Sequence, residues 1–482
     1  MLSNTKFLSA IGCLFFFSCT VFAADTTEVR STLDDQQSVA VTIYNGNLAL
    51  VKDQRKVKLK MGENNLALRD VSAQIRPETA LLRGISNEGS ISTIEQNFDF
   101  DLLTPQKLLE KYVGKNVRIV RTNSATGVES TENATVLAAS SGVVLRIGDR
   151  IETGIPGRII YDNVPDNLRD RPTLVTRINN NTANEQTIEL SYLTGGLDWR
   201  ADYVAELNEK DNALDLSGWV TLTNTSGTSY NNAKLQLVAG DVNRVPEPEV
   251  YGGLAKRKAM AAASVGSDMS EQSLMEYHLY SLDRPTTIAE NQTKQVALLS
   301  ATGVPVRKEL VLHGADYYYQ SSYGDLGQKM KVGVFIEFDN RENSKLGMPL
   351  PKGVMRVYKK DSQGNAQFVG EDNIDHTPKN ETVRLKLGEA FDVTADKKQT
   401  DFKRIARPDK DSRVFESAYE VVLKNAKSEP VTVTVQEPIP ADWKMLEENY
   451  PSEKATSNTA VWKIKIPAEE KVALKYRVQV KY

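Results

Sequence analysis

The residues best suited to chemistry lie in one acidic stretch, Glu371-Asp-Asn-Ile-Asp375-His376. Carboxylates beside an imidazole could hold a calcium ion or activate a water molecule between them. Glu371, Asp372, Asp375 and His376 are therefore the candidate catalytic residues. Their spacing does not match a calcium-binding hand loop, and acidic residues at the end of a strand are usually solvated. The solvated interpretation is favoured over the catalytic one.

The number and positions of the histidines and cysteines exclude several enzyme classes. The three histidines, His278, His313 and His376, lie in different stretches and show no metal-ligand spacing. Both cysteines, Cys13 and Cys19, fall in an N-terminal leader, so the exported chain would contain none. Disulfides, thiolate catalysis and cysteine-bound zinc are then excluded. We expect no cofactor and no bound metal.

A second set of residues could bind a ligand or partner instead. Tyr317-Tyr-Tyr319 is followed closely by Tyr323. In a strand, Tyr317 and Tyr319 would share one face and Tyr318 would take the other, so at least one ring could be exposed. Tyrosine offers a large contact area at low entropic cost, which suits a sugar, a peptide or a protein surface. Tyr317, Tyr318, Tyr319 and Tyr323 are the candidate binding residues, and the alternative is that neighbouring modules cover them.

The elements that must position these residues are strands. An alternating apolar strand that runs into an asparagine, followed by a polar turn and a second strand, recurs at Asn45, Asn179, Asn224, Asn340 and Asn425. The period of two indicates strands with one buried face. Asparagine suits such exits because it tolerates a left-handed backbone and its side chain can bond the turn. Packed face to face, these strands predict a mainly β protein built of several immunoglobulin-like β-sandwich modules.

One segment breaks this pattern. Thr104 is placed to cap a short helix, Pro105 takes its first position and Gly114 ends it. Short strands separated by glycine turns follow, and they predict a small barrel-like sheet. The expected domains are a signal peptide at 1–23, an N-terminal β-domain at 37–100, the helix and barrel-like module at 101–165, sandwich domains at 166–410 interrupted by a mobile loop at 246–270, and a C-terminal sandwich module at 411–482.

The first 23 residues predict export. They carry Lys6, an apolar run from Phe7 to Phe17, and the small-residue pattern Val21-Phe-Ala23 that a signal peptidase reads. Cleavage near Ala23 would leave a periplasmic or secreted chain. The apolar run is short for a membrane span, and no second one of spanning length follows, so no integral membrane segment is expected in the mature chain.

Charge gives no indication of nucleic-acid binding. The formal net charge is -3 at pH 7. Basic clusters such as Lys256-Arg-Lys258 and Lys397-Lys398 are short, and we expect both in solvated loops.

Several motifs resemble a bacterial exported family of unknown function. They include Ser191-Tyr-Leu-Thr-Gly-Gly-Leu-Asp-Trp-Arg-Ala-Asp-Tyr203, Gly218-Trp-Val-Thr-Leu-Thr-Asn224 and Leu350-Pro-Lys-Gly-Val-Met-Arg-Val-Tyr358. A related domain forms the C-terminal half of mucoidy-inhibitor-like proteins, although this chain lacks their long heptad helix. The resemblance implies an exported, multi-module β protein, and it transfers no active-site residue.

We therefore expect a non-catalytic scaffold or binding protein of the cell envelope, with a protein or envelope component as partner. The alternative is a carbohydrate-active or metal-assisted envelope hydrolase that uses the acidic stretch around His376.

Overall fold

The structure is a computed structural model of the whole chain. It describes residues 28–99, 101–140, 142–165, 168–240, 242–243, 269–405 and 413–482. The predicted signal peptide lies outside these ranges, as does nearly all of the predicted loop at 246–270. Its last two residues, Met269 and Ser270, begin strand β17 (Met269–Leu274) and are not part of a loop.

The described residues form a mainly β structure, as predicted. They divide into two compact units: unit 1 comprises residues up to 36, 55–71 and 82–189, and unit 2 comprises 37–54, 72–81 and 190–482. Boundaries between the units fall within β2 (Gln36–Tyr44), β3 (Leu48–Lys58), β5 (Leu81–Gly84) and β13 (Glu185–Thr194). Short 3-10 helices are η1 (Leu33–Asp35), η2 (Pro77–Thr79), η3 (Asp316–Tyr319) and η4 (Glu342–Ser344). None of the helices in the described ranges combines the length and apolar composition that crossing a membrane requires.

Unit 1 contains two sheets. The first has the order β1 (Val29–Ser31), β4 (Gly62–Arg69), β12 (Thr173–Asn180), β6 (Ile91–Asp99). The second has the order β10 (Arg150–Thr153), β9 (Val144–Ile147), β8 (Glu129–Ala138), β7 (Asn116–Thr122), β11 (Arg158–Ile160). Each is open at both edges, so the predicted barrel-like closure is wrong. The edge strands β10 and β11 each pair with one neighbour, β9 and β7, and not with each other.

The predicted helix is present beside the second sheet. It is α1 (Pro105–Lys111), and the Thr104 side chain accepts a hydrogen bond from the Lys107 amide. Leu109 and Tyr112 pack with inward residues of β7 and β8 in a small core. In the part of the chain that the structure describes, α1 is the one α-helix.

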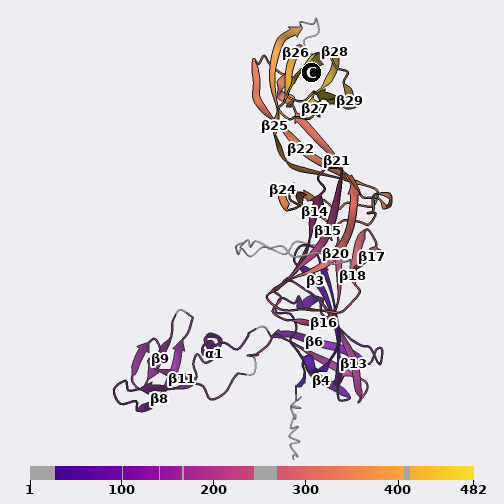
Figure 1. Cartoon of the computed structure of the whole chain (residues 1–482). Coiled ribbons are helices and arrows are strands. Elements are labelled where there is room, and N and C mark those ends of the chain that lie inside the picture. The colour runs from indigo at the N-terminus through magenta and orange to yellow at the C-terminus, as the bar shows by residue number, and fades with distance from the viewer. Residues whose placement is uncertain are drawn as a thin grey trace, which may run out of the picture. The chain divides into compact units, whose positions relative to one another are not determined.

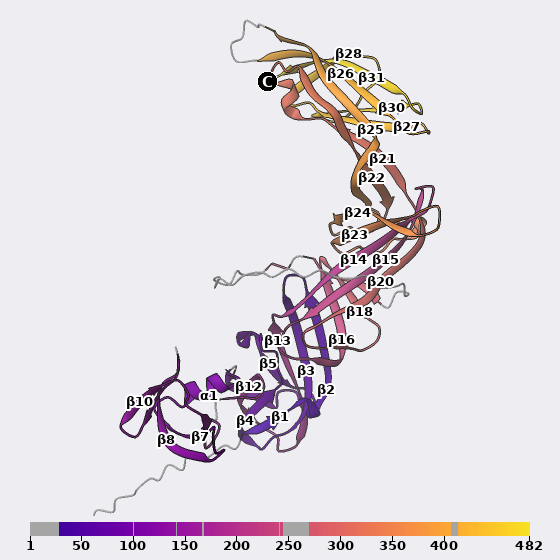
Figure 2. The ribbon, with the colours of Figure 1, turned by 60° about the vertical axis from the view of Figure 1, so that its left-hand side comes forward.

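Unit 2 contains the longer strands (Figures 1 and 2). In one sheet β16 (Tyr230–Ala239) lies between β18 (Tyr277–Leu282) and β2, and β17 follows β18, while β19 (Thr286–Ile288) also pairs with β16. A five-stranded sheet has the order β20 (Gln292–Pro305), β15 (Ala213–Asn224), β14 (Leu197–Leu207), β23 (Gly353–Lys360), β24 (Ala366–Ile374). A nine-stranded sheet has the order β28 (Asp442–Glu448), β31 (Lys471–Lys481), β26 (Val414–Asn425), β25 (Thr382–Ile405), β22 (Asp325–Asp339), β21 (Arg307–His313), β27 (Val431–Pro438), β30 (Thr459–Ile466), β29 (Glu453–Thr456).

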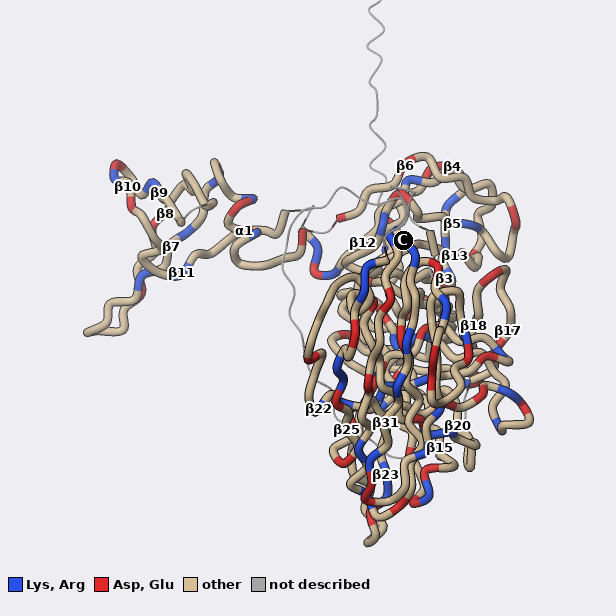
Figure 3. The backbone as a smooth tube through the Cα atoms, turned by 90° about the horizontal axis from the view of Figure 1, so that it is seen from above, with Lys and Arg blue, Asp and Glu red and all other residues tan. Residues whose placement is uncertain are grey.

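Charged residues of both signs are interspersed along these strands (Figure 3). Opposite charges face each other on the solvent-facing sides of neighbouring strands. The Glu420 carboxylate of β26 lies 2.6 Å from Lys398 Nζ of β25 and 3.1 Å from Lys475 Nζ of β31. Such cross-strand pairs neutralise each other locally. The pattern agrees with the small net charge of the sequence.

Buried asparagines hold the strand ends of unit 2. Asn425 Nδ2 donates to the carbonyls of Glu429 and Pro467, both at 2.9 Å, while its Oδ1 accepts from the Lys427 amide at 3.1 Å. Asn340 likewise donates to Met348 and Pro378 and accepts from Gly347. The prediction that these side chains bond the turn is confirmed.

Asn224 repeats the Asn425 arrangement at the same spacing. Its Nδ2 donates to the Thr228 carbonyl four residues on and to the Ile288 carbonyl, and its Oδ1 accepts from the Ser226 amide two residues on. Ile288 lies four residues before β20, as Pro467 lies four residues before β31. The β15–β16–β20 and β26–β27–β31 segments therefore share one local design. Neither asparagine has a positive φ, so the tolerance of asparagine for a left-handed backbone is not used here and the side-chain amide explains the residue.

Replacement of Asn425 by alanine tests this role. Asn425→Ala leaves two carbonyls and one amide without their partner inside the fold, which should lower the free energy of unfolding by roughly 2 kcal/mol. Urea unfolding followed by tryptophan fluorescence measures the change. Asn343→Ala, at an exposed position of η4, is the matched control and should leave stability unchanged. Equal stability of the two variants would contradict the role.

Candidate functional site

The acidic stretch does not form a cluster of free carboxylates. Glu371 and Asp372 are adjacent in β24, so their side chains leave opposite faces of the strand. Glu371 pairs with Arg356 at 3.2 Å, and Asp372 accepts a hydrogen bond from the Lys386 amide at 2.8 Å. Both carboxylates are therefore used in contacts between strands.

Asp375 and His376 follow in the turn after β24. The Asp375 carbonyl accepts from the Thr377 hydroxyl, and His376 Nδ1 accepts from the Lys352 amide at 3.2 Å. Across the described ranges, no three residues of the types His, Cys, Asp and Glu lie close enough together to hold a metal ion. The catalytic role of Glu371, Asp372, Asp375 and His376 stays a prediction, and these contacts do not support it.

The tyrosine segment has a different backbone from the predicted strand. Residues Asp316–Tyr319 form the 3-10 helix η3. At three residues per turn, adjacent tyrosines do not alternate between two faces. Tyr318 and Tyr319 are both buried, while Tyr317 is 48% exposed and Tyr323 is half-buried. The segment thus has two inward rings and an outward edge.

Hydrogen bonds fasten this segment, which we call the tyrosine turn (residues 316–323), and the residues just before it to the strands beneath. The Tyr419 hydroxyl donates to the Tyr318 carbonyl at 2.7 Å. Gln399 Nε2 donates to the Ser321 carbonyl at 3.1 Å, and Gln399 Oε1 accepts from the Tyr323 amide at 2.6 Å. Gly314, just before the turn, donates its amide to the Gln436 carbonyl at 2.8 Å. The turn is therefore attached to three separate strands.

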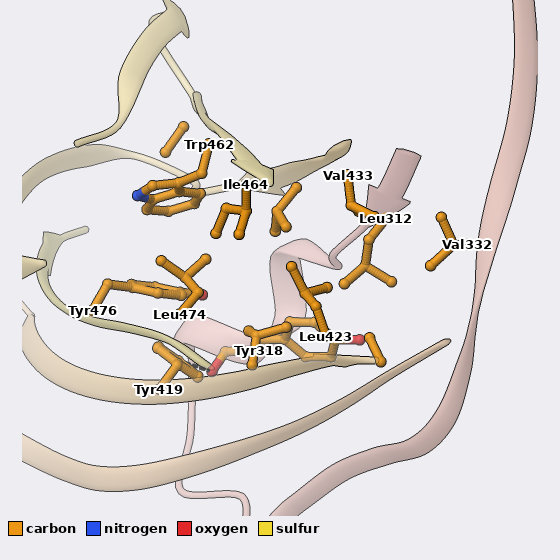
Figure 4. Close-up of a cluster of buried hydrophobic side chains, with 14 of the residues drawn as sticks. Leu312, Tyr318, Val332, Tyr419, Leu423, Val433, Trp462, Ile464, Leu474 and Tyr476 are labelled. Atoms are coloured by element: carbon orange, nitrogen blue, oxygen red, sulfur yellow. Dashed lines mark hydrogen bonds between the residues drawn. The ribbon is translucent and has the colours of Figure 1, made fainter. Parts of the chain in front are cut away.

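Beneath the tyrosine turn lies the core of the nine-stranded sheet, which curls so that its two halves face each other (Figure 4). Tyr419 of β26 pairs directly with Tyr476 of β31 across the strands. The Trp462 ring of β30, from the other half, lies 4.8 Å from the Tyr476 ring. These aromatic rings fill the space between the two halves.

A lysine–glutamate pair lies within this apolar core. Lys397 continues the inward row of β25 after Val393 and Ala395, and Glu437 continues the inward row of β27 after Val433 and Val435. Lys397 Nζ lies 2.6 Å from Glu437 Oε2, and the two side chains are 0% and 1% exposed. The expectation that Lys397 is in a solvated loop is wrong, because the alternation of β25 directs it inward, while its neighbour Lys398 is exposed.

Two tyrosine hydroxyls complete a closed ring of hydrogen bonds around the pair. Lys397 Nζ donates to the Tyr476 hydroxyl at 3.2 Å, and the Tyr319 hydroxyl donates to Glu437 Oε2 at 2.9 Å. The two hydroxyls lie 3.0 Å apart. We call these four residues the buried ring. It ties η3, β25, β27 and β31 to one point.

Burial shifts the pKa values of three members of the buried ring. Burial lowers the pKa of Lys397, and the charge of Glu437 acts against that effect. Burial also raises the pKa of Tyr319 and of Tyr476 well above the ordinary value. Lys397 Nζ lies 4.3 Å from the centre of the Tyr318 ring, a distance at which the ring attracts a cation.

Gly314 leaves room for the carboxylate. A Cβ atom at this position would lie 2.1 Å from Glu437 Oε2, well inside van der Waals contact. Any larger residue would push the carboxylate away from Lys397. Gly314 is thus part of the site, although nothing in its sequence context indicates this.

On the outside, an aromatic strip continues from the tyrosine turn. The Tyr317 ring lies 5.7 Å from the Tyr323 ring. Tyr482, 36% exposed, lies near the turn: burial and the charge of Asp316 raise its pKa, and a hydrogen bond with Gln320 opposes them. The strip then runs through Phe415, 5.8 Å from Tyr482, to Phe402, which stacks on Phe415 at 5.5 Å. Sequence reasoning found Tyr317 and Tyr323 but missed the other three rings, which come from distant strand ends.

Comparison with known proteins identifies a family and no activity. The profile of a family described as a domain of unknown function (DUF4139) matches residues 188–482. No curated protein matches the chain. The predicted link to mucoidy-inhibitor-like proteins stays a prediction.

Replacement of Lys397 by an uncharged residue should lower the free energy of unfolding. Lys397→Met leaves Glu437 buried without its partner, and removal of one member of a buried pair costs about 3–5 kcal/mol of stability. Lys398→Met makes the same chemical change one residue along, on the wet face, and should cost less than about 1 kcal/mol. Urea unfolding of both variants measures the difference. Similar losses in the two would contradict the structural role of the buried ring.

Proposed function

The chain belongs to the DUF4139 family, and we propose that it is a non-catalytic binding protein of the cell envelope. The aromatic strip (Tyr317, Tyr323, Tyr482, Phe415 and Phe402) would be its contact surface. The observation that carries the proposal is the exposed Tyr317 ring on a turn whose backbone and neighbouring rings are fixed from below. An anchor held in place before binding loses little conformational entropy when a partner docks.

The partner that this surface suits best is another protein. Exposed tyrosines concentrate binding energy at protein interfaces because one ring combines apolar contact area with a hydrogen-bonding hydroxyl. Gln320 and Asp316 lie beside Tyr317 and would supply a polar rim. The edge strand β28 pairs with β31 on one side, and it would offer a second, backbone-mediated contact to the same partner.

The place of action in this proposal is the periplasm or the medium outside the cell. The leader at residues 1–23 supports export. We further propose that the sheets of unit 2 are immunoglobulin-like sandwiches in tandem, because the shared Asn224 and Asn425 arrangements repeat one strand-turn-strand design. The same modules would form the C-terminal half of mucoidy-inhibitor-like proteins.

Export can be tested on the chain itself. If a signal peptidase cleaves after Ala23, the protein recovered from the exported fraction begins at Ala24, since the small residues at 21 and 23 fit its pocket. N-terminal sequencing of the fractionated protein measures this. Recovery of the uncleaved chain in the cytoplasmic fraction would contradict export.

Binding can be tested at single positions. A photoreactive phenylalanine analogue at position 317 should give one discrete protein adduct in living cells, and the same probe at Phe391, which is 94% exposed, should not. For the purified partner so identified, Tyr317→Ser should weaken binding by about 30-fold or more, as removal of an interface anchor does.

Two outcomes would contradict this proposal. One is unchanged affinity of the Tyr317→Ser variant for the adduct protein. The other is a glycan in place of a protein at position 317, which would redirect the proposal to carbohydrate binding. Because Tyr317 contributes no atom to the buried ring, its substitution should leave the fold intact, and the free energy of unfolding of the variant provides that control.

A further inference from the structure

The buried ring brings an amine and a carboxylate together from two strands that are not neighbours in the sheet. β25, which carries Lys397, and β27, which carries Glu437, are separated in the sheet by β22 and β21. The 2.6 Å contact of their side chains therefore joins the two facing halves of the curled sheet. No backbone hydrogen-bond ladder connects β25 and β27.

One oxygen of the Glu437 carboxylate has hydrogen-bond partners and the other has none. Oε2 has two partners, Lys397 and Tyr319, but Oε1 is buried and has no hydrogen-bond partner. A buried ionised carboxylate can accept several hydrogen bonds, and an oxygen left without one carries a desolvation cost. A neutral carbonyl oxygen in that place would carry a smaller cost. Burial likewise lowers the pKa of Lys397 and so favours its neutral amine.

We propose that Lys397 and Glu437 condense to an intramolecular isopeptide bond between Nζ and Cδ, with the buried ring as its own catalyst. This modification site is independent of the binding function proposed above. It requires no cofactor, oxidant or added reagent, because the reacting groups and the acid–base groups belong to the same ring.

The condensation forms one amide bond and releases one water molecule. A proton passes from Nζ to Oε2 across their contact, which leaves a neutral amine and a carboxylic acid. The nitrogen lone pair attacks Cδ, the N–C bond forms, and the C=O electron pair moves to Oε1. The Cδ–Oε2 bond then breaks as the Oε1 electron pair returns to carbon. Oε2 leaves as water after receiving a second proton, and the products are one amide and one water molecule.

The two tyrosines provide the route for that second proton. The hydrogen bond from Nζ points to the Tyr476 hydroxyl, and the hydrogen bond from Tyr319 points to Oε2. With the two hydroxyls 3.0 Å apart, Tyr476 can accept a proton from nitrogen while Tyr319 donates one to the leaving oxygen. Tyr476 passes its own proton to Tyr319 in the same concerted transfer, so each hydroxyl ends with one proton. The absence of a side chain at Gly314 lets the carboxylate stay beside Lys397, since a Cβ there would lie 2.6 Å from Cδ.

The intact mass of the purified full chain tests the proposal directly. The folded protein should be lighter than its sequence by about 18 Da, the mass of one water molecule. Proteolysis should release one branched peptide joining the segments around Lys397 and Glu437. Lys398→Ala is the matched control and should keep the mass loss, whereas Lys397→Ala should abolish it.

Two further variants separate this chemistry from a structural ion pair. Glu437→Gln should lose ammonia in place of water, a decrease of about 17 Da, because the amide nitrogen then leaves. Tyr319→Phe removes the acid and should leave a fraction of the molecules at full mass. A wild-type chain at its full sequence mass would overturn the proposal, and complete closure in Tyr319→Phe would overturn the role of the relay.

Discussion

The contact between Lys397 and Glu437 is the constraint on which the C-terminal part of unit 2 depends. A charge in an apolar core is costly unless it is paired and hydrogen-bonded. The fold meets this requirement with two tyrosine hydroxyls, an aromatic ring over the ammonium group and a glycine that makes room for the carboxylate. These groups come from β31 and from residues 314–319, while the pair itself comes from β25 and β27, so their register is correct only when the whole curled sheet has formed. The pair thereby selects one packing of the two halves.

The exposed surface follows from this buried arrangement. Tyr319 belongs to the buried ring, and Tyr317 stands two residues earlier in the same 3-10 helix. The backbone position of Tyr317 is therefore tied to that of Tyr319, and Gln399, two residues after Lys397 in the same inward row of β25, holds the end of the turn. The asparagines at strand exits play the corresponding role elsewhere in unit 2, since a single amide side chain replaces the hydrogen bonds that a regular turn would have made.

The features that depend on local sequence patterns, such as strands, turns and the helix, could be predicted from the sequence. Alternation identified the strands, and the role of Asn224, Asn340 and Asn425 in bonding their turns was read correctly from their position. The helix at 105–111 was marked by its cap and its proline. The tyrosine segment was misread because Tyr317-Tyr-Tyr319 is compatible with a strand, and only distant contacts from Tyr419 and Gln399 select the 3-10 conformation. The signal for Lys397 was present: buried Val393, Ala395, Lys397 and Gln399 alternate with polar residues that are less buried. Its partner Glu437 is 40 positions away, and no local pattern connects the two.

If the buried ring holds the tyrosine turn in place, amide hydrogen exchange of residues 315–323 should depend on Lys397. We expect strong protection of the Tyr318, Gln320 and Tyr323 amides in the wild-type chain and in Lys398→Met. We expect loss of that protection in Lys397→Met under conditions where the strands of unit 1 remain protected. Equal protection of the turn in all three proteins would contradict this role, because the turn would then be held without the link between Lys397 and Glu437.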